Sequence, residues 1–438
     1  MDGLTLVLIA AIMLFCLAAM FFQARRRYEL ALAMILLSPW VHFLFAPDIP
    51  ETPEDMLSAA GSIEPSTPIR MGIVLFAGSI GITKLLESIP WSDERMPPVF
   101  FVLGAFILYA LLSTGYSIDQ SYTFVRTAEF IAFFGFLLGL FFWLSEPAHM
   151  DRAIDIFFLC VIVGTAANLC TLAFLPDRAW WWAAPDRLQG FMSHPNTLGG
   201  FCMVSYPILL WEYTRRGVVG KSLIAVMALM LLGMHILSGS RTTLAASLAG
   251  FALWQVILNR KALFILVVSL ILFGGYFLMQ SRLPSFERQE SSQITYLTGR
   301  TEFWTGSVAL AMERPILGYG YGVEGKVWED PRFQSEKVRL WLGSAKSSLH
   351  NGYLSVLIGL GTVGLVLWLA ALFPPVLGVV SAPVSPSKAV ILVILMQVLM
   401  VNLFETVITT SRTLESITFW VFWTLAIRYR DFTAQEVT

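Results

Sequence analysis

Five basic side chains of this 438-residue chain stand at the edges of apolar or amphipathic segments, where charge is costly to place. They are Arg187, His194, Arg241, Arg300 and His350. Guanidinium groups bind phosphate oxygens through paired hydrogen bonds, and a neutral imidazole accepts a proton near physiological pH. The arginines of such a set could hold a diphosphate leaving group while one histidine, His350, acts as a base.

The chemistry that fits one base and several cations at a membrane surface is the transfer of a glycan from a lipid diphosphate carrier. The arginines would neutralise the charge that grows on the departing diphosphate, as a divalent metal does in many sugar transferases. We therefore expect no metal ion and no other cofactor. The chain also contains no Asp-x-Asp triplet, which argues against a metal-dependent nucleotide-sugar enzyme.

Three of the five basic residues also have a structural explanation. Arg241 follows the small residues 238–240 between two apolar runs, so it could extend to lipid headgroups while the small residues allow close helix packing. His194 precedes a helix start, where a structural role and a role in a site are equally supported. A lone histidine such as His350 is usually a helix cap or interfacial residue. The nearby arginines favour a function for it, either as a base or as an orienting hydrogen-bond donor.

The composition predicts an all-α polytopic membrane protein. Hydrophobic residues make up 56% of the chain, charged residues 13%, and the mean hydropathy is +0.70. A net charge of -1 gives no indication of a nucleic-acid partner, and the expected surroundings are the lipid bilayer. Apolar runs of about 18 to 23 residues predict twelve or thirteen transmembrane helices. The candidate spans are 4–22, 29–47, 69–87, 98–115, 123–144, 154–175, 196–213, 221–238, 242–258, 262–279, 350–373, 388–406 and 414–428.

Short basic segments orient these spans. Arginine and lysine at 25–27, 215–221, 259–261 and 428–430 predict cytoplasmic loops and a cytoplasmic tail. This orientation places on the outer side the loops 176–195, 238–241 and 280–349, which carry four of the five basic residues, and it places His350 at the outer end of the span that follows. The acidic, proline-rich loop 48–68 lies on the same side and is best explained as a solvated linker.

The long polar loop 280–349 contains one predicted helix. From Thr301 to Arg314 apolar residues recur at helical spacing, and Pro315 ends the pattern. The predicted apolar face, which we expect to lie on the membrane surface, consists of Phe303, Trp304, Val308, Ala311 and Met312. The sequence GYGYG at 318–322 then predicts a turn, whose two tyrosines could stack on a sugar.

Five motifs together resemble the O-antigen ligase and polymerase superfamily of bacterial envelope proteins. They are HPNTLGG (194–200), SGSRTTL (238–244), GRTEFW (299–304), RPILGYGYG (314–322) and HNGYL (350–354). Gly361 and Thr362 follow the last motif at the spacing of the family. The resemblance covers about 185–365, so we divide the chain into amino-terminal transmembrane helices at 1–175 and a ligase/polymerase-like region at 176–438.

The resemblance implies a metal-independent, inverting transferase that uses an undecaprenyl-diphosphate-linked glycan as donor and a glycan or lipid A-core as acceptor. It places the enzyme in the bacterial inner membrane with the site facing the periplasm. By position it assigns diphosphate binding to Arg187, Arg241 and Arg300 and an essential role to His350, with Asn351 and His194 as further substrate-binding residues. GRTEFW followed by RPILGYGYG is closer to exopolysaccharide polymerases than to core ligases, and both activities stay open.

Two other classes of protein compete with this interpretation. A transporter or flippase of lipid-linked glycans would also need many spans and buried arginines, although such proteins usually show two related halves. A metal-dependent oligosaccharyltransferase would use the acidic residues of 48–55. The polar residues of this chain are instead concentrated in its second half, on one predicted side.

Overall fold

The computed structural model of the protein describes residues 27–44, 66–88, 96–181, 184–258, 261, 300–329, 350–409 and 412–435. The spans predicted at 4–22 and 262–279 lie outside these residues, as does the acidic stretch 48–55. Of the predicted loop 280–349, only residues 300–329 are described.

The described chain is almost entirely helical, because in lipid every backbone N–H and C=O group must be bonded within the protein. Its elements are α2 (Arg27–Leu37), η1 (Ser38–Trp40), α3 (Val41–Leu44), α5 (Ser66–Ser88), α6 (Pro98–Leu112), η2 (Ser113–Gly115), α7 (Gln120–Trp143), α8 (Pro147–Phe174), α9 (Pro176–Ala179), β1 (Trp180–Trp181), β2 (Ala184–Leu188), α10 (Pro195–Arg215), α11 (Val218–Ser238), α12 (Arg241–Leu258), α14 (Arg300–Glu313), α15 (Glu324–Glu329), α17 (Gly352–Val380), α18 (Pro386–Val401) and α19 (Leu414–Gln435). The two strands form one short antiparallel pair.

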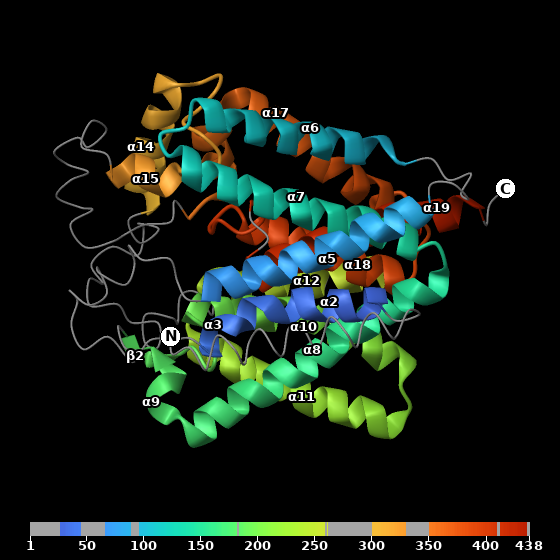
Figure 1. The fold of residues 1–438 in the computed structure, drawn as a ribbon. Helices are drawn as coiled ribbons and strands as arrows, with labels where there is room; N and C mark the ends of the chain where they lie inside the picture. The colour runs from blue at the N-terminus through green and yellow to red at the C-terminus, as the bar shows by residue number, and fades with distance from the viewer. Residues whose placement is uncertain are drawn as a thin grey trace, which may run out of the picture.

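Seven helices within the described residues are long and apolar enough to cross a membrane: Pro68–Ser88, Pro98–Gly115, Gln120–Trp143, Pro147–Phe174, Val218–Ser238, Arg241–Leu258 and Gly352–Val380. Tyr28–Trp40 and Pro386–Val401 are shorter apolar helices. The protein is therefore an all-α polytopic membrane protein, as the composition predicts. Figure 1 shows α9, β2, α14 and α15 at one end of the helix bundle and the end of α19 at the other.

The glycine-rich turn after α14 is bonded into a kink of α17. At Gly361 the backbone has φ 64° and ψ -167°, which interrupts the helix. Carbonyl groups around this break accept hydrogen bonds from the turn, as in Gly320 N–H to Gly359 O at 2.8 Å. In the opposite direction, Thr362 N–H donates to Pro315 O at 2.7 Å. The kink thus fixes the glycine-rich turn against the first part of α17.

Helix α14 confirms the predicted helix but presents a different face to the protein. Its buried residues are Ser307, Leu310 and Ala311, and the helix packs on α17. Val308 and Met312, which the periodicity placed on the apolar face, are 47% and 70% exposed. Their exposure is compatible with a face that lies on the membrane surface, whereas Ala311 of the predicted face packs inside the protein.

The tyrosines of the GYGYG turn are buried, so they do not form an exposed surface for stacking on a sugar, although Tyr321 lines a small cavity. Tyr319 is 0% exposed, and its hydroxyl donates to a Glu313 carboxylate oxygen at 3.0 Å. Tyr321 is 5% exposed, and its hydroxyl donates to the carbonyl of Thr409. Both side chains hold the turn in place.

Candidate active site

Glu405 joins two residues that lie far apart in the sequence. It lies in the turn after α18, where one carboxylate oxygen, Oε2, is 2.7 Å from Nδ1 of His350. The other oxygen, Oε1, accepts a hydrogen bond from Nδ2 of Asn196 at 3.1 Å. A single carboxylate therefore connects the start of α17 with the start of α10.

Arg187 extends this chain of contacts to a third segment. Its Nη2 donates to Oδ1 of Asn196 at 2.9 Å, and its Nε donates to the carbonyl of Ser238 at 2.9 Å. Ser238 ends α11 just before the tight turn that leads to Arg241. Strand β2, the start of α10 and the α11–α12 junction thus meet around one guanidinium group.

The backbone around His350 explains how its imidazole reaches Glu405. His350 has φ 47°, a left-handed conformation that is uncommon for residues other than glycine. Gly352 N–H donates to the carbonyl of Asn402 at 2.9 Å, and this contact ties the start of α17 to the turn that carries Glu405. Strained backbone of this kind persists only where surrounding contacts fix it, and it is frequent at functional sites.

Asn351 is the cap of α17. Its Oδ1 accepts hydrogen bonds from the N–H groups of Tyr353 and Leu354, both at 3.0 Å. Such a cap satisfies two of the backbone donors that a helix start leaves without partners. This contact gives Asn351 a structural task that directly supports the position of His350.

His194 caps α10 in a similar way. Its Nδ1 accepts a hydrogen bond from Asn196 N–H at 3.0 Å, so the neutral ring carries its proton on Nε2. The ring of Trp181 packs edge-on against the imidazole at 4.7 Å, and the Arg187 guanidinium lies 5.6 Å from the same indole. His194 therefore helps to place both Asn196 and Arg187.

The other two predicted arginines begin helices near this network. Arg241 is the first residue of α12, directly after the Ser238 turn, and is half-buried. Arg300 is the first residue of α14, and its side chain lies outside the described part of the structure. One turn later, Trp304 lies 6.0 Å from Phe404, the neighbour of Glu405. The start of α14 is thus beside the turn that carries Glu405.

Comparison with known proteins relates part of this chain to a family of bacterial membrane proteins. Residues 208–369 match the family model described as O-antigen ligase. This match supports a relationship to the O-antigen ligase and polymerase superfamily over that part of the chain. A curated relative, the O-antigen ligase of Pseudomonas aeruginosa, is 27% identical over 284 residues. That alignment covers 62% of this chain and 63% of the relative, so the chain spans less than two thirds of the relative's length.

The match to the O-antigen ligase family covers only some of the residues in this polar network. It includes Arg241, Arg300 and His350, whereas Arg187 and Glu405 lie outside it. Glu405 was not among the site residues predicted from the sequence. The sequence does contain an indication of a role for Glu405, because a carboxylate at the end of the apolar run 388–406 is as unusual as an arginine there.

An apolar groove lies among the helices that carry this polar network. It has a volume of about 420 Å³ and lies between α12, α17 and α18. Its lining includes Tyr353 and Leu403, which are close in sequence to His350 and Glu405. Other lining side chains, among them Ala249, Leu253, Phe373, Met396 and Met400, continue the groove away from the polar network.

Proposed function

We propose that the protein transfers an undecaprenyl-diphosphate-linked glycan to a sugar hydroxyl at the periplasmic face of the bacterial inner membrane. The observation that carries this proposal is the contact of Glu405 with Nδ1 of His350. It is supported by the family match and by the hydrogen bonds that join Arg187 to Asn196, a partner of the same carboxylate, and to Ser238 before α12.

The pair supplies a base. A carboxylate on Nδ1 favours the tautomer with its proton on Nδ1, so Nε2 carries the lone pair that accepts a proton. The acceptor hydroxyl oxygen forms a bond to the anomeric carbon as the bond from that carbon to the diphosphate oxygen breaks. The hydroxyl proton passes to Nε2, and Glu405 stabilises the imidazolium. One displacement of this kind inverts the anomeric configuration.

The arginines hold the diphosphate. Arg187 is fixed by two hydrogen bonds, so its guanidinium needs no reorganisation as charge develops on the leaving group. Arg241 at the start of α12 and Arg300 at the start of α14 complete the cationic set, and helix starts themselves favour anions. These cations take the place of a metal ion in our scheme.

The apolar groove accounts for the lipid part of the donor. A polyprenyl chain attached to a diphosphate must pass from a polar site into an apolar environment. The groove between α12, α17 and α18 has about 420 Å³ of space, and its lining includes Tyr353 and Leu403, which are near His350 and Glu405 in the chain. We assign it to the first isoprene units of the donor.

Transfer assays with purified protein test this function. Lipid-linked glycan donor and acceptor should give product in the presence of EDTA, and His350→Ala protein should give none while remaining folded. Activity that disappears with EDTA and returns with Mn²⁺ or Mg²⁺ would favour the metal-dependent alternative. Movement of intact donor across vesicles without product would favour a flippase.

The surface glycan of a deletion strain separates the two activities of the superfamily. A ligase deletion leaves long polymer on its lipid carrier, whereas a polymerase deletion leaves single repeat units. The relative is an O-antigen ligase, while the motifs at 299–322 resemble those of polymerases. The reaction at His350 is the same in both cases, because each joins a lipid-linked glycan to a hydroxyl.

A further inference from the structure

A second cavity lies on another face of α17. It has a volume of about 80 Å³ and is bordered by α7, α17 and the turn that precedes α15. Its polar lining consists of Tyr122, Arg126, Glu129, Glu324, Ser355 and Thr409. A cavity needs about 10–15 Å³ of such volume for each buried water, so this one has room for about six water-sized groups.

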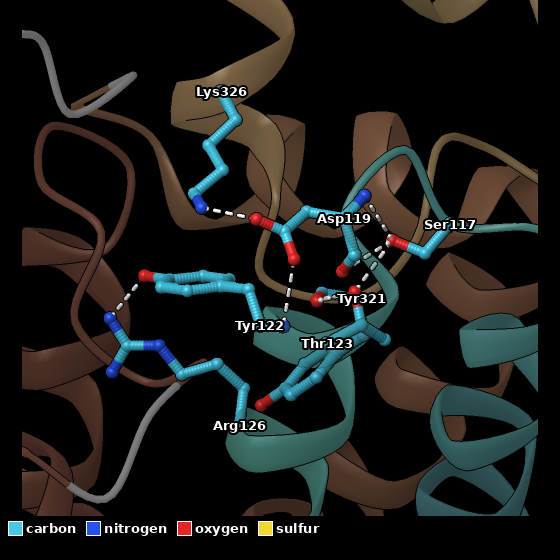
Figure 2. A network of polar contacts seen from close by, with 7 residues as sticks. All are labelled: Ser117, Asp119, Tyr122, Thr123, Arg126, Tyr321 and Lys326. Carbon is cyan, nitrogen blue, oxygen red and sulfur yellow. Dashed lines mark hydrogen bonds and ion pairs between the residues drawn. The ribbon is translucent and has the colours of Figure 1, made fainter.

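The guanidinium of Arg126 has hydrogen-bond partners among the described residues for only part of its N–H groups. Nη2 donates a hydrogen bond to the Tyr122 hydroxyl, a contact that Figure 2 shows beside the start of α7. Nη1 is buried, makes no hydrogen bond with any described residue and lies 3.9 Å from Glu129. A buried donor without a hydrogen bond is costly, so a ligand that accepts from Nη1 would be favoured.

The cavity offers acceptors as well as a donor. Oε1 of Glu324 accepts a hydrogen bond from the Ser355 hydroxyl at 3.0 Å. Glu129 is held by Arg412, whose Nε and Nη2 both lie 2.8 Å from Oε2. Two guanidinium groups thus balance two carboxyl groups, and this balance suits a neutral ligand with hydroxyls better than a phosphate.

The wall of the cavity includes aromatic rings. Phe130 and Tyr321 line it, with their rings parallel to within 10° and their centroids 6.3 Å apart. Sugars combine hydroxyls with apolar C–H faces, so a pocket with Arg and Glu side chains beside aromatic carbon matches their chemistry. The cavity therefore fits part of a neutral sugar ring.

The position of the cavity relates it to His350. Ser355 lies 3.5 Å from the Thr406 hydroxyl, next to Glu405, and it follows His350 by five positions in the chain. The apolar groove is lined by Tyr353 and the cavity by Ser355, two residues that are about 200° apart around a helix. The start of α17 thus stands between an apolar groove and a polar cavity.

We propose that this cavity binds the sugar ring of the acceptor glycan whose hydroxyl attacks the donor. Arg126 donates to one ring hydroxyl, and Glu324 accepts from a neighbouring one. This assignment rests on the proposed function, because it places the acceptor on one side of His350 and the lipid-linked donor on the other. It names a neutral, hydroxylated sugar as the ligand.

Steady-state kinetics of Arg126→Gln test the assignment. We expect the KM for the acceptor to rise at least tenfold, while the KM for the donor and kcat change less than threefold. Ser355→Ala, a smaller change in the same cavity, should raise the acceptor KM as well. Arg152→Gln is the matched control, because Arg152 is 58% exposed and pairs with Glu29 away from the site. A rise in donor KM alone, or no change in acceptor KM, overturns the assignment.

Direct binding separates this inference from the proposed function. The probes are the oligosaccharide repeat unit and the core oligosaccharide of the host strain, each freed from lipid and diphosphate by mild acid. Wild type and His350→Ala should bind one of them, and Arg126→Gln should bind it at least tenfold more weakly. If transfer fails while this difference in binding holds, the proposed function is wrong and the cavity assignment stands. If wild type binds neither probe, or if inorganic phosphate displaces the sugar, the assignment is wrong.

Discussion

His350 Nδ1 and Glu405 Oε2 lie 2.7 Å apart across 55 positions of the chain. The same carboxylate accepts a hydrogen bond from Asn196, which in turn accepts one from Arg187. The proposed base and one proposed diphosphate-binding cation are therefore positioned by one continuous network. A change at Glu405 should affect both proton transfer and donor binding.

Glu405→Gln should lower kcat by roughly 10²- to 10⁴-fold. The glutamine amide can donate to Nδ1, which favours the tautomer with its proton on Nε2 and removes the base. It also lacks the charge that stabilises an imidazolium. Initial rates at saturating donor and acceptor measure the effect, and thermal unfolding in detergent checks the fold. A rate within threefold of wild type would show that Glu405 does not act on His350.

Arg187→Lys should lower kcat/KM for the donor by roughly 10- to 100-fold. A lysine cannot reach both the Ser238 carbonyl and Asn196, and hydrogen bonds to charged groups contribute about 1.5–3 kcal/mol. Arg152→Lys, on the exposed surface, is the control and should keep wild-type kinetics. A variant in which only the acceptor KM changes would contradict the assignment of Arg187 to the diphosphate.

The sequence predicts the helices of this protein well, since a run of apolar residues in lipid has few alternatives to a helix. It also points to His350 and Arg187, because charged or titratable side chains beside apolar runs are costly and stand out. Glu405 is equally unusual, but its link to His350 depends on how α17 and α18 pack. Hydrophobic spacing does not contain that information.

Other features of the structure could not be predicted for the same reason, namely that hydrophobic spacing does not describe how helices pack. The spacing of apolar residues locates α14 but does not show that a polar residue, Ser307, is buried inside the protein. It is also insensitive to backbone angles, so the kink at Gly361 is invisible in an otherwise continuous apolar run. The burial of Tyr319 follows from that kink, because the kink receives the turn on which Tyr319 lies.

Gly361→Ala should destabilise the protein by about 2 kcal/mol or more. The residue has φ 64°, and a Cβ there would lie 2.1 Å from the carbonyl oxygen of Ile316. Gly233→Ala in α11 is the matched control, since a Cβ there meets nothing within 4 Å and alanine favours a helix. Thermal unfolding in one detergent should show a lower Tm for the first variant only. Equal Tm values would mean that the kink tolerates a side chain.

The ion pair between Asp119 and Lys326 should make the attachment of α15 to α7 depend on pH. Oδ1 of Asp119 also accepts from Tyr122 N–H at 2.9 Å, and Figure 2 shows both contacts. The hydrogen bond from Lys326 holds the pKa of Asp119 below its usual value. The pair therefore stabilises the fold above the usual carboxyl pKa of about 4, and this stability is lost as the pH falls through the lowered pKa.

Asp119→Asn measures that contribution. Its Tm should be lower than that of wild type at pH 7. The difference should shrink as the pH falls from about 4 through the lowered pKa of Asp119, below which the wild-type carboxyl is protonated too. Asp151→Asn is the control, because Asp151 is 52% exposed and lies 4.0 Å from Arg215 at the other end of the bundle. It should leave the Tm unchanged at both pH values. The Tm difference between Asp119→Asn and wild type could also stay constant at pH values below the lowered pKa of Asp119. That result would exclude the ion pair as the cause of the difference.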